Sequence, residues 1–183
     1  MSEDALVAYG SPTLAGLKTG NLFSVPREEK HALAESIRRL NGCLVPRGVR
    51  LVVVRQTARR VLVYLYRPAR LRRDWQDPLA REILSRRGYP VEDPERCVAQ
   101  LARRLGEGED FPHEIGLFLG YPPRDVAGFM ADCEHPRCTG VWKVYSDVDQ
   151  AKRTFALYDK CARLYREAWR RHGSFSRLVV RQH

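Results

Sequence analysis

VRLVVVRQT (residues 49–57) and RVLVYLYR (residues 60–67) are two neighbouring runs of β-branched and aromatic residues, and they decide the fold class. Residues of these types are enriched in strands, and the very short connection between the runs predicts an antiparallel hairpin. Helical patterns surround the hairpin, but they do not alternate with strands in the order of a parallel sheet. We therefore expect an α+β fold, in which a small, mostly antiparallel sheet packs against several helices.

The segment before the hairpin combines turn-forming residues with one helical pattern. Residues 10–24, GSPTLAGLKTGNLFS, are rich in Gly, Ser and Thr, and they predict an ordered loop. Ser24 is a candidate N-cap for a helix that runs to Leu40, where Asn-Gly follows.

The segment after the hairpin is mainly helical. Helices are expected at about 77–87, 94–105 and 148–171, and two short helices flank a Gly-Tyr-Pro-Pro turn. GVWKVY at 140–145 predicts a further strand of the sheet, and RLVV at 177–180 is a candidate final strand.

The predicted helix at 148–171 carries one continuous apolar face. Its members recur every three or four residues and are Ala151, Phe155, Tyr158, Ala162, Tyr165 and Trp169. Such a face is typical of a helix packed on a sheet. The alternative is an aromatic wall for a flavin or a porphyrin.

Length and composition limit the class of protein. The 183 residues, 44% of them hydrophobic, suffice for one core, so we expect a single domain over residues 1–183. No run approaches the roughly 20 apolar residues of a membrane span, and the N-terminus lacks a signal-peptide pattern. The five cysteines are an odd number and argue against a disulfide framework. We expect a cytoplasmic protein with reduced thiols and no membrane partner.

The net charge of +10 is unevenly distributed. Residues 47–87 hold twelve basic and three acidic residues, whereas the middle of the chain is acidic. The candidate partner surface in this block comprises Arg59, Arg60, Arg67, Arg70, Arg72 and Arg73. Such a surface suits an acidic protein or nucleic acid, but no helix-turn-helix, RNP or zinc-finger pattern accompanies it. Nucleic acid is therefore the less favoured partner.

Residues 111–126, FPHEIGLFLGYPPRDV, form the most unusual run of the chain. Glycines and prolines are dense here, as they are where a chain bends tightly or approaches a ligand closely. His113 and Glu114 stand at the start of a predicted short helix. They are either structural, at a helix terminus, or an acid/base pair, because histidine is suited to proton transfer near pH 7.

Residues 12–21 offer polar groups for an anion. Lys18, Thr19 and Asn21 supply a cation, a hydroxyl and an amide, and Thr13 precedes them. The spacing is not that of a P-loop, so the segment is either an anion-binding loop or an ordered structural loop.

Cys133 and Cys138 enclose a histidine in a C-x₄-C arrangement. Structural zinc sites need a second ligand pair, which is absent here, so no metal site is predicted. The other cysteines are most simply packing residues.

Four stretches of the chain are distinctive when they are taken together. They are PTLAGLKTGNLFS (12–24), VYLYRP (63–68), FPHEIGLFLGYPPRDVAGF (111–129) and GVWKVYSD (140–147). A chain with these motifs resembles a bacterial family known only as domain of unknown function 3793, found largely in anaerobes. The resemblance spans nearly the whole chain. It implies no established activity, but it implies a link to iron or low-potential redox metabolism.

The sequence thus leads to a hypothesis of one ligand pocket, formed by the 12–21 loop, residues 111–126 and the 140–145 strand. The proposed ligand-binding residues are Thr13, Lys18, Thr19, Asn21, Tyr121, Trp142 and Lys143, with His113 and Glu114 as candidate catalytic residues. In this hypothesis Lys18 and Lys143 hold an anionic group, and Tyr121 or Trp142 stacks on a flat ligand. The cofactor, if there is one, is unknown. The alternative is a basic binding or regulatory module that contacts nucleic acid or an acidic protein such as a flavodoxin.

Overall fold

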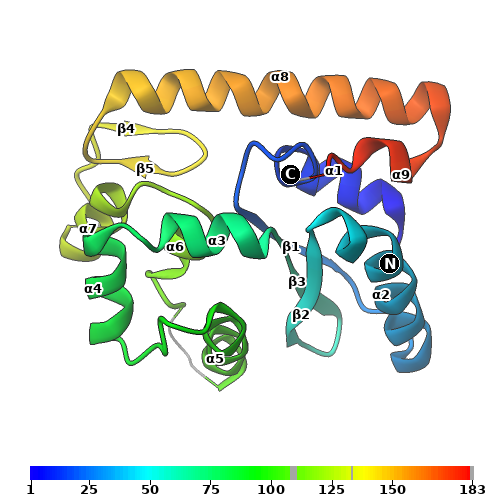
Figure 1. Cartoon of the computed structure of the whole chain (residues 1–183), viewed down its shortest axis with the longest axis horizontal. Helices are drawn as coiled ribbons and strands as arrows, with labels where there is room; N and C mark the ends of the chain where they lie inside the picture. The colour runs from blue at the N-terminus through cyan, green and yellow to red at the C-terminus, as the bar shows by residue number, and fades with distance from the viewer. Residues whose placement is uncertain (108–110, 133, 182–183) are drawn as a thin grey trace.

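The computed structural model describes residues 1–107, 111–132 and 134–181, and the predicted hairpin lies at its centre (Figure 1). β2 (Arg50–Gln56) and β3 (Arg60–Tyr66) pair antiparallel, which confirms the hairpin. A further strand, β1 (Gly20–Pro26), pairs antiparallel with the other edge of β3. The sheet order is therefore β1-β3-β2, and the α+β class is confirmed.

The central strand β3 is buried on both faces of the sheet. Val61, Val63 and Leu65 belong to one core cluster, whereas Tyr64 and Tyr66 belong to another. This division follows the two-residue period of a strand, in which successive side chains point to opposite faces. The two clusters therefore share a single sheet.

Separate groups of helices cover the two faces. The face of Val61 packs against α1 (Glu3–Leu14), α2 (Lys30–Leu44) and α9 (Phe175–Leu178). The opposite face packs against α3 (Pro68–Asp74), α4 (Pro78–Arg86), α5 (Pro94–Glu107), α6 (Ile115–Phe118) and α7 (Pro123–Ala131). The helices expected at 77–87 and 94–105 are confirmed as α4 and α5. Proline begins each of α3, α4, α5 and α7, a position where its missing N–H is not needed.

The long C-terminal helix, α8 (Val148–His172), is also confirmed, and it runs along α1 rather than directly on the sheet (Figure 1). Asp147 caps it by accepting a hydrogen bond from the Gln150 amide. Its apolar face meets two clusters: Ala151 and Tyr158 pack with Trp142, and Tyr165 and Trp169 pack near α1.

The boundaries predicted for residues 10–24 are wrong. α1 extends to Leu14 and β1 begins at Gly20, so only residues 15–19 form a turn. Ser24 lies in β1, where it accepts a hydrogen bond from Arg60, and is not a helix cap. The strand forms because its backbone groups hydrogen-bond to β3. This partner lies about 40 positions away in the chain, so a local sequence pattern does not indicate the pairing.

The helix that follows, α2, continues past Asn41-Gly42 to Leu44. The Asn41 side chain both donates to and accepts from the backbone of Leu51, at 2.8 and 3.0 Å. Asn41 therefore ties the helix to β2 instead of ending it.

The segments 140–145 and 177–180 do not join the sheet. The first contributes only β5 (Lys143–Val144), which pairs with β4 (Cys138–Thr139) in a separate two-stranded sheet. The candidate strand at 177–180 is partly the short helix α9, and the Val180 amide donates to the Leu14 carbonyl at 3.0 Å. That hydrogen bond caps the end of α1, so the Val180 amide does not pair with a strand of the sheet.

Within the described residues, no helix combines the length and the apolar character that crossing a membrane requires.

Candidate functional site

The turn between α1 and β1 carries Lys18 and Thr19 into the interior. Gly16 has a φ of 77°, and the Lys18 amide donates to the Pro12 carbonyl at 3.0 Å, so the chain reverses tightly after α1. Lys18 is only 4% exposed, and its Nζ lies 5.1 Å from the Tyr121 ring centre and 6.0 Å from that of Tyr158. The turn thus places an ammonium group between two aromatic rings.

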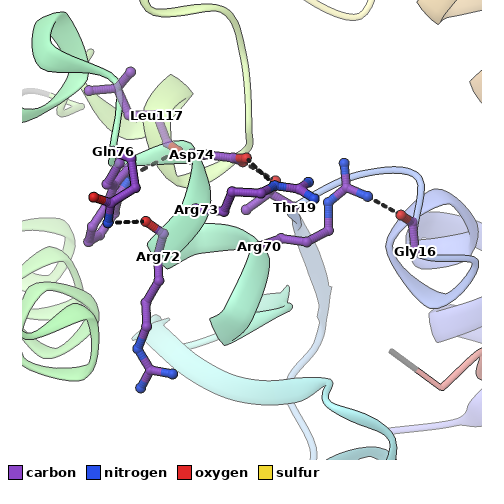
Figure 2. Close-up of polar contacts among 9 residues, drawn as sticks. Gly16, Thr19, Arg70, Arg72, Arg73, Asp74, Gln76 and Leu117 are labelled. Carbon is purple, nitrogen blue, oxygen red and sulfur yellow. Dashed lines mark hydrogen bonds and ion pairs between the residues drawn. The ribbon is translucent and has the colours of Figure 1, made fainter. Parts of the chain in front are cut away.

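The same turn is held by α3. Thr19 Oγ1 donates a hydrogen bond to Asp74 Oδ2, and Arg70 Nη1 donates to the Gly16 carbonyl (Figure 2). Arg70 and Asp74 are four positions apart and therefore lie on the same side of α3. Arg72 extends away from them in Figure 2. The helix that follows the hairpin therefore presents the Arg70 cation to the Gly16 carbonyl and the Asp74 carboxylate to the Thr19 hydroxyl.

Side chains of the turn and of α3 line a cavity of about 290 Å³, which we call the polar pocket. Its lining includes Lys18, Thr19, Arg70, Asp74, Tyr121 and Tyr158. Asp74 already accepts a hydrogen bond from the Thr19 hydroxyl, and Asp77, also in the lining, caps α4. By contrast, Arg70 Nε is buried without an acceptor, and no carboxylate of the described chain lies within ion-pair distance of Lys18 Nζ. The Lys18 ammonium in this lining is therefore not neutralised by a carboxylate of the described residues, and the Arg70 guanidinium adds a second positive charge.

Burial also controls the ionisation of this lining. Desolvation lowers the pKa of Lys18 to about 8, because the charged form loses its hydration and gains no anion. Desolvation raises the pKa of Tyr121 and of Tyr158 to about 12. At neutral pH both phenols keep their protons, and Lys18 is mostly an ammonium with a minor neutral fraction.

A second cavity, of about 460 Å³, lies on the other side of Tyr121, and we call it the apolar pocket. Its lining includes His113, Tyr121, Val126, Phe129, Trp142 and Lys143. The Tyr121 and Trp142 rings stack with centres 5.0 Å apart. His113 and Lys143 are exposed and lie 4.9 and 5.4 Å from the Phe129 ring centre, so two polar groups flank an aromatic hollow.

Asp125 fixes the wall between these elements. It is 2% exposed, and its Oδ2 accepts from Trp142 Nε1 at 2.8 Å. Its Oδ1 accepts from the Tyr145 amide and from the amide and hydroxyl of Ser146, at 2.7–2.9 Å. One buried carboxylate therefore organises the segment that the sequence predicts as a strand.

His113 and Glu114 do not form a pair in the structure. Glu114 is 1% exposed and accepts hydrogen bonds at 3.0 Å from the Tyr89 hydroxyl and from Arg104 Nη1. His113 instead faces Phe129 at the surface. Successive residues of a helical turn point about 100° apart, which separates these neighbours in space. Glu114 thus closes an ion pair within the core.

Thr13 and Asn21 hydrogen-bond to each other, with Thr13 Oγ1 donating to Asn21 Oδ1 at 2.7 Å. Neither residue is in the lining of the polar pocket. The structure therefore brings together Lys18, Thr19 and Tyr121 at one cavity, and His113, Tyr121, Trp142 and Lys143 at the other. Lys18 and Lys143 line different cavities that share Tyr121 as a wall.

The placement of Arg67 on a partner surface is wrong, because this residue is 0% exposed. Its guanidinium donates to the carbonyls of Thr13, Leu14 and Val180 at 2.6–2.8 Å. The carbonyls of the last turn of a helix lack intrahelical partners, and a cation there is stabilising. Arg67 thus closes the end of α1.

The other members of the predicted surface do not share one role. Arg60 donates to the side chain and the backbone of Ser24, at 2.7 and 2.8 Å, and Arg70 lines the polar pocket. Arg59, Arg72 and Arg73 are exposed.

No group of three or more His, Cys, Asp and Glu residues that could hold a metal ion occurs among the described residues. Cys133 lies outside those residues, so the spacing of Cys133 and Cys138 is not tested. Cys97 and Cys161 are buried, and desolvation raises the pKa of each thiol to about 11.

Sequence reasoning missed Asp74, Asp125 and the contribution of Tyr158 to a cavity. Asp74 ends an arginine-rich helix, and Asp125 stands in the first turn of a helix, a common position for a solvated acid. Tyr158 fits the packing stripe of α8. No local signal distinguishes these residues from surface or core residues.

The fold and the cavities define an α+β protein with a buried lysine in a small polar pocket, and no carboxylate among the described residues pairs with that lysine. The chain belongs to the family described as "Protein of unknown function (DUF3793)", whose model matches residues 6–179. Neither a curated protein nor a solved structure matches the chain.

Proposed function

We propose that this protein binds a small anionic molecule in the polar pocket, with the acid group held between Lys18 and Arg70. One observation carries the proposal: the Lys18 ammonium is buried beside a cavity, and no carboxylate of the described chain pairs with it. An unpaired buried cation costs several kcal/mol, and such groups are retained mainly at functional sites.

The surroundings of Lys18 support an anion as the ligand. Arg70 is a second cation in the lining of the same cavity, and its buried Nε has no acceptor in the described residues. The volume of about 290 Å³ suits a small metabolite better than a nucleotide. Trp142, Lys143 and His113 line the neighbouring apolar pocket, which shares only Tyr121 of the described residues with the polar pocket.

Thermal unfolding with and without added anions tests the proposal. We expect phosphate, succinate, pyruvate or 2-oxoglutarate to raise the Tm of the wild-type protein. Lys18→Met and Arg70→Gln should remove that rise, because each deletes one donor. The matched control is Lys143→Met, which changes a lysine of the apolar pocket and should keep the rise.

Two results would contradict the proposal. One is a wild-type protein whose Tm none of these anions changes. The other is a rise of equal size in Lys18→Met and in the wild-type protein.

The alternative, a basic module for nucleic acid or an acidic protein, has weaker support. Arg60, Arg67 and Arg70 donate hydrogen bonds within the chain, and Arg73 Nε lies 4.0 Å from Asp74 Oδ1. Arg59 and Arg72 are left for such contacts. A complex made by the exposed arginines would weaken steeply with salt and would not respond to Lys18→Met.

We further propose a cytoplasmic location and a role connected with iron or low-potential redox metabolism. The free thiols of Cys43, Cys97, Cys138 and Cys161 support a reducing compartment. The redox role rests on the family resemblance alone, and an absorption spectrum of the purified protein would reveal a bound chromophore.

A further inference from the structure

We propose that Lys18 is a nucleophile that forms an imine with small 2-oxo acids, whose carboxylate binds to Arg70. This inference rests on the proposed function, because it assigns a substrate class and a reaction to the same pocket.

The environment of Lys18 suits a nucleophilic amine. An amine attacks a carbonyl carbon only in its neutral form, and lysines reach that form near neutral pH when they are desolvated. Lys18 is 4% exposed, and burial lowers its pKa to about 8. A neighbouring carboxylate would hold the proton on the amine, and the described chain places none within ion-pair distance.

The lysines of this chain differ sharply in environment. Lys30, Lys143, Lys152 and Lys160 are all exposed, whereas Lys18 alone of the chain's lysines is buried. Among the lysines, only Lys18 therefore combines burial with a place in the lining of a cavity.

Arg70 favours 2-oxo acids over other carbonyl compounds, because its guanidinium can bind their carboxylate. The Arg70 side chain lines the cavity, and its Nη1 donates to the Gly16 carbonyl (Figure 2). Its Nε is buried and has no acceptor in the described residues. A planar guanidinium matches a carboxylate, and in a 2-oxo acid the carbonyl carbon is bonded directly to that carboxylate. The cavity of about 290 Å³ has room for a molecule of this size.

The reaction is balanced by groups already present. The neutral Nζ attacks the keto carbon, the C=O electron pair moves to oxygen, and a carbinolamine forms. Transfer of a proton to the carbinolamine hydroxyl releases water, and loss of the N–H proton leaves the imine. The net change is amine plus ketone to imine plus water, with no oxidant or reductant.

One phenol beside Lys18 can supply the proton for this reaction. The Tyr158 ring centre lies 6.0 Å from Lys18 Nζ, whereas the Tyr121 hydroxyl donates to the Val141 carbonyl at 3.2 Å. Burial raises the pKa of Tyr158 to about 12, so its hydroxyl holds a proton at neutral pH that it can donate to the leaving hydroxyl.

Reductive trapping tests the inference. The protein is incubated with pyruvate and sodium cyanoborohydride, and the adduct is located by peptide mass spectrometry. We expect one adduct per chain, on Lys18, and none on that position in Lys18→Arg, which keeps the charge but cannot form a neutral amine. Arg70→Gln should lower the rate of labelling at limiting pyruvate by about tenfold, because a charge-assisted contact to the carboxylate is lost.

Propionate separates failure of the reaction from failure of the pocket, because it has the carboxylate but no keto group. If pyruvate and propionate both raise the Tm but no adduct forms on Lys18, the imine is wrong and anion binding stands. Labelling spread equally over the exposed lysines would also overturn the inference. If neither acid binds and no adduct forms, the imine is wrong, and the Tm measured with phosphate and succinate decides whether anion binding stands.

Discussion

Lys18 is a residue whose burial opposes folding, and this has a measurable pH dependence. Its pKa falls from 10.5 in the unfolded chain to about 8 in the folded protein, so between these values the unfolded state binds more protons. The penalty is complete below about pH 8 and disappears as the pH rises towards 10.5. We therefore expect Lys18→Met to gain roughly 3 kcal/mol over the wild-type protein at pH 7, and to lose that gain by pH 10.5.

Urea unfolding of the wild-type protein and of Lys18→Met at pH 7 and pH 10 measures the difference in their free energies of unfolding. The titration of the other groups is common to both proteins and cancels in that difference. Lys143→Met is the control, because Lys143 is exposed. A Lys18→Met advantage that is the same at both pH values would show that Lys18 is hydrated in the folded protein.

The junction between α6 and α7 is the element on which the polar pocket depends. Gly120 has a φ of 75°, and a Cβ at this position would lie 2.6 Å from Thr19 Oγ1 and 3.4 Å from Asp74 Oδ2. Gly120→Ala therefore adds backbone strain and pushes against the hydroxyl that bonds Asp74. We expect a loss of about 2–4 kcal/mol in the free energy of unfolding, together with loss of the anion-induced rise in Tm.

Gly42→Ala is the matched control, because Gly42 lies in α2 with nothing within 4 Å of the added Cβ. An alanine within a helix should stabilise by about 0.5 kcal/mol. Equal effects of the two substitutions in urea unfolding would mean that the contact of Gly120 with Thr19 is unimportant.

At the level of the whole molecule, one sheet supports both principal clusters. Val63 and Tyr64 are adjacent in β3 but pack in clusters on opposite faces. Unfolding of β3 would therefore disrupt both clusters at once. We expect one cooperative unfolding transition, which agrees with the predicted single domain.

The tryptophans make this prediction measurable, because Trp75, Trp142 and Trp169 belong to or pack against different clusters. Fluorescence reports all three, and far-ultraviolet circular dichroism reports the helices. Coincident transitions in fluorescence and circular dichroism would support a single cooperative unit. A change in fluorescence before the loss of helix would show that the protein unfolds in more than one unit.

Several elements were predictable because their signals are local. The hairpin follows from two β-rich runs, α4 and α5 from an acid and a proline at their starts, and α8 from a D-x-x-Q pattern and a long apolar stripe. β1 was not predictable, because its ladder partner β3 is distant in the chain. Among the site residues, Lys18, Thr19 and Tyr121 stood out from the sequence, but their meeting with Arg70, Asp74 and Tyr158 did not.

Local propensities, capping and periodicity are properties of short segments, and they established the α+β class and most helices. Whether a charged side chain is paired, buried or exposed depends on contacts between distant segments. Arg67 and Arg70 are three positions apart in one basic block, yet one closes the end of α1 and the other lines a cavity. Glu114 lies in the core beside an exposed His113. The free energy of these charges is set by desolvation and by their partners, and both arise only when the chain has folded.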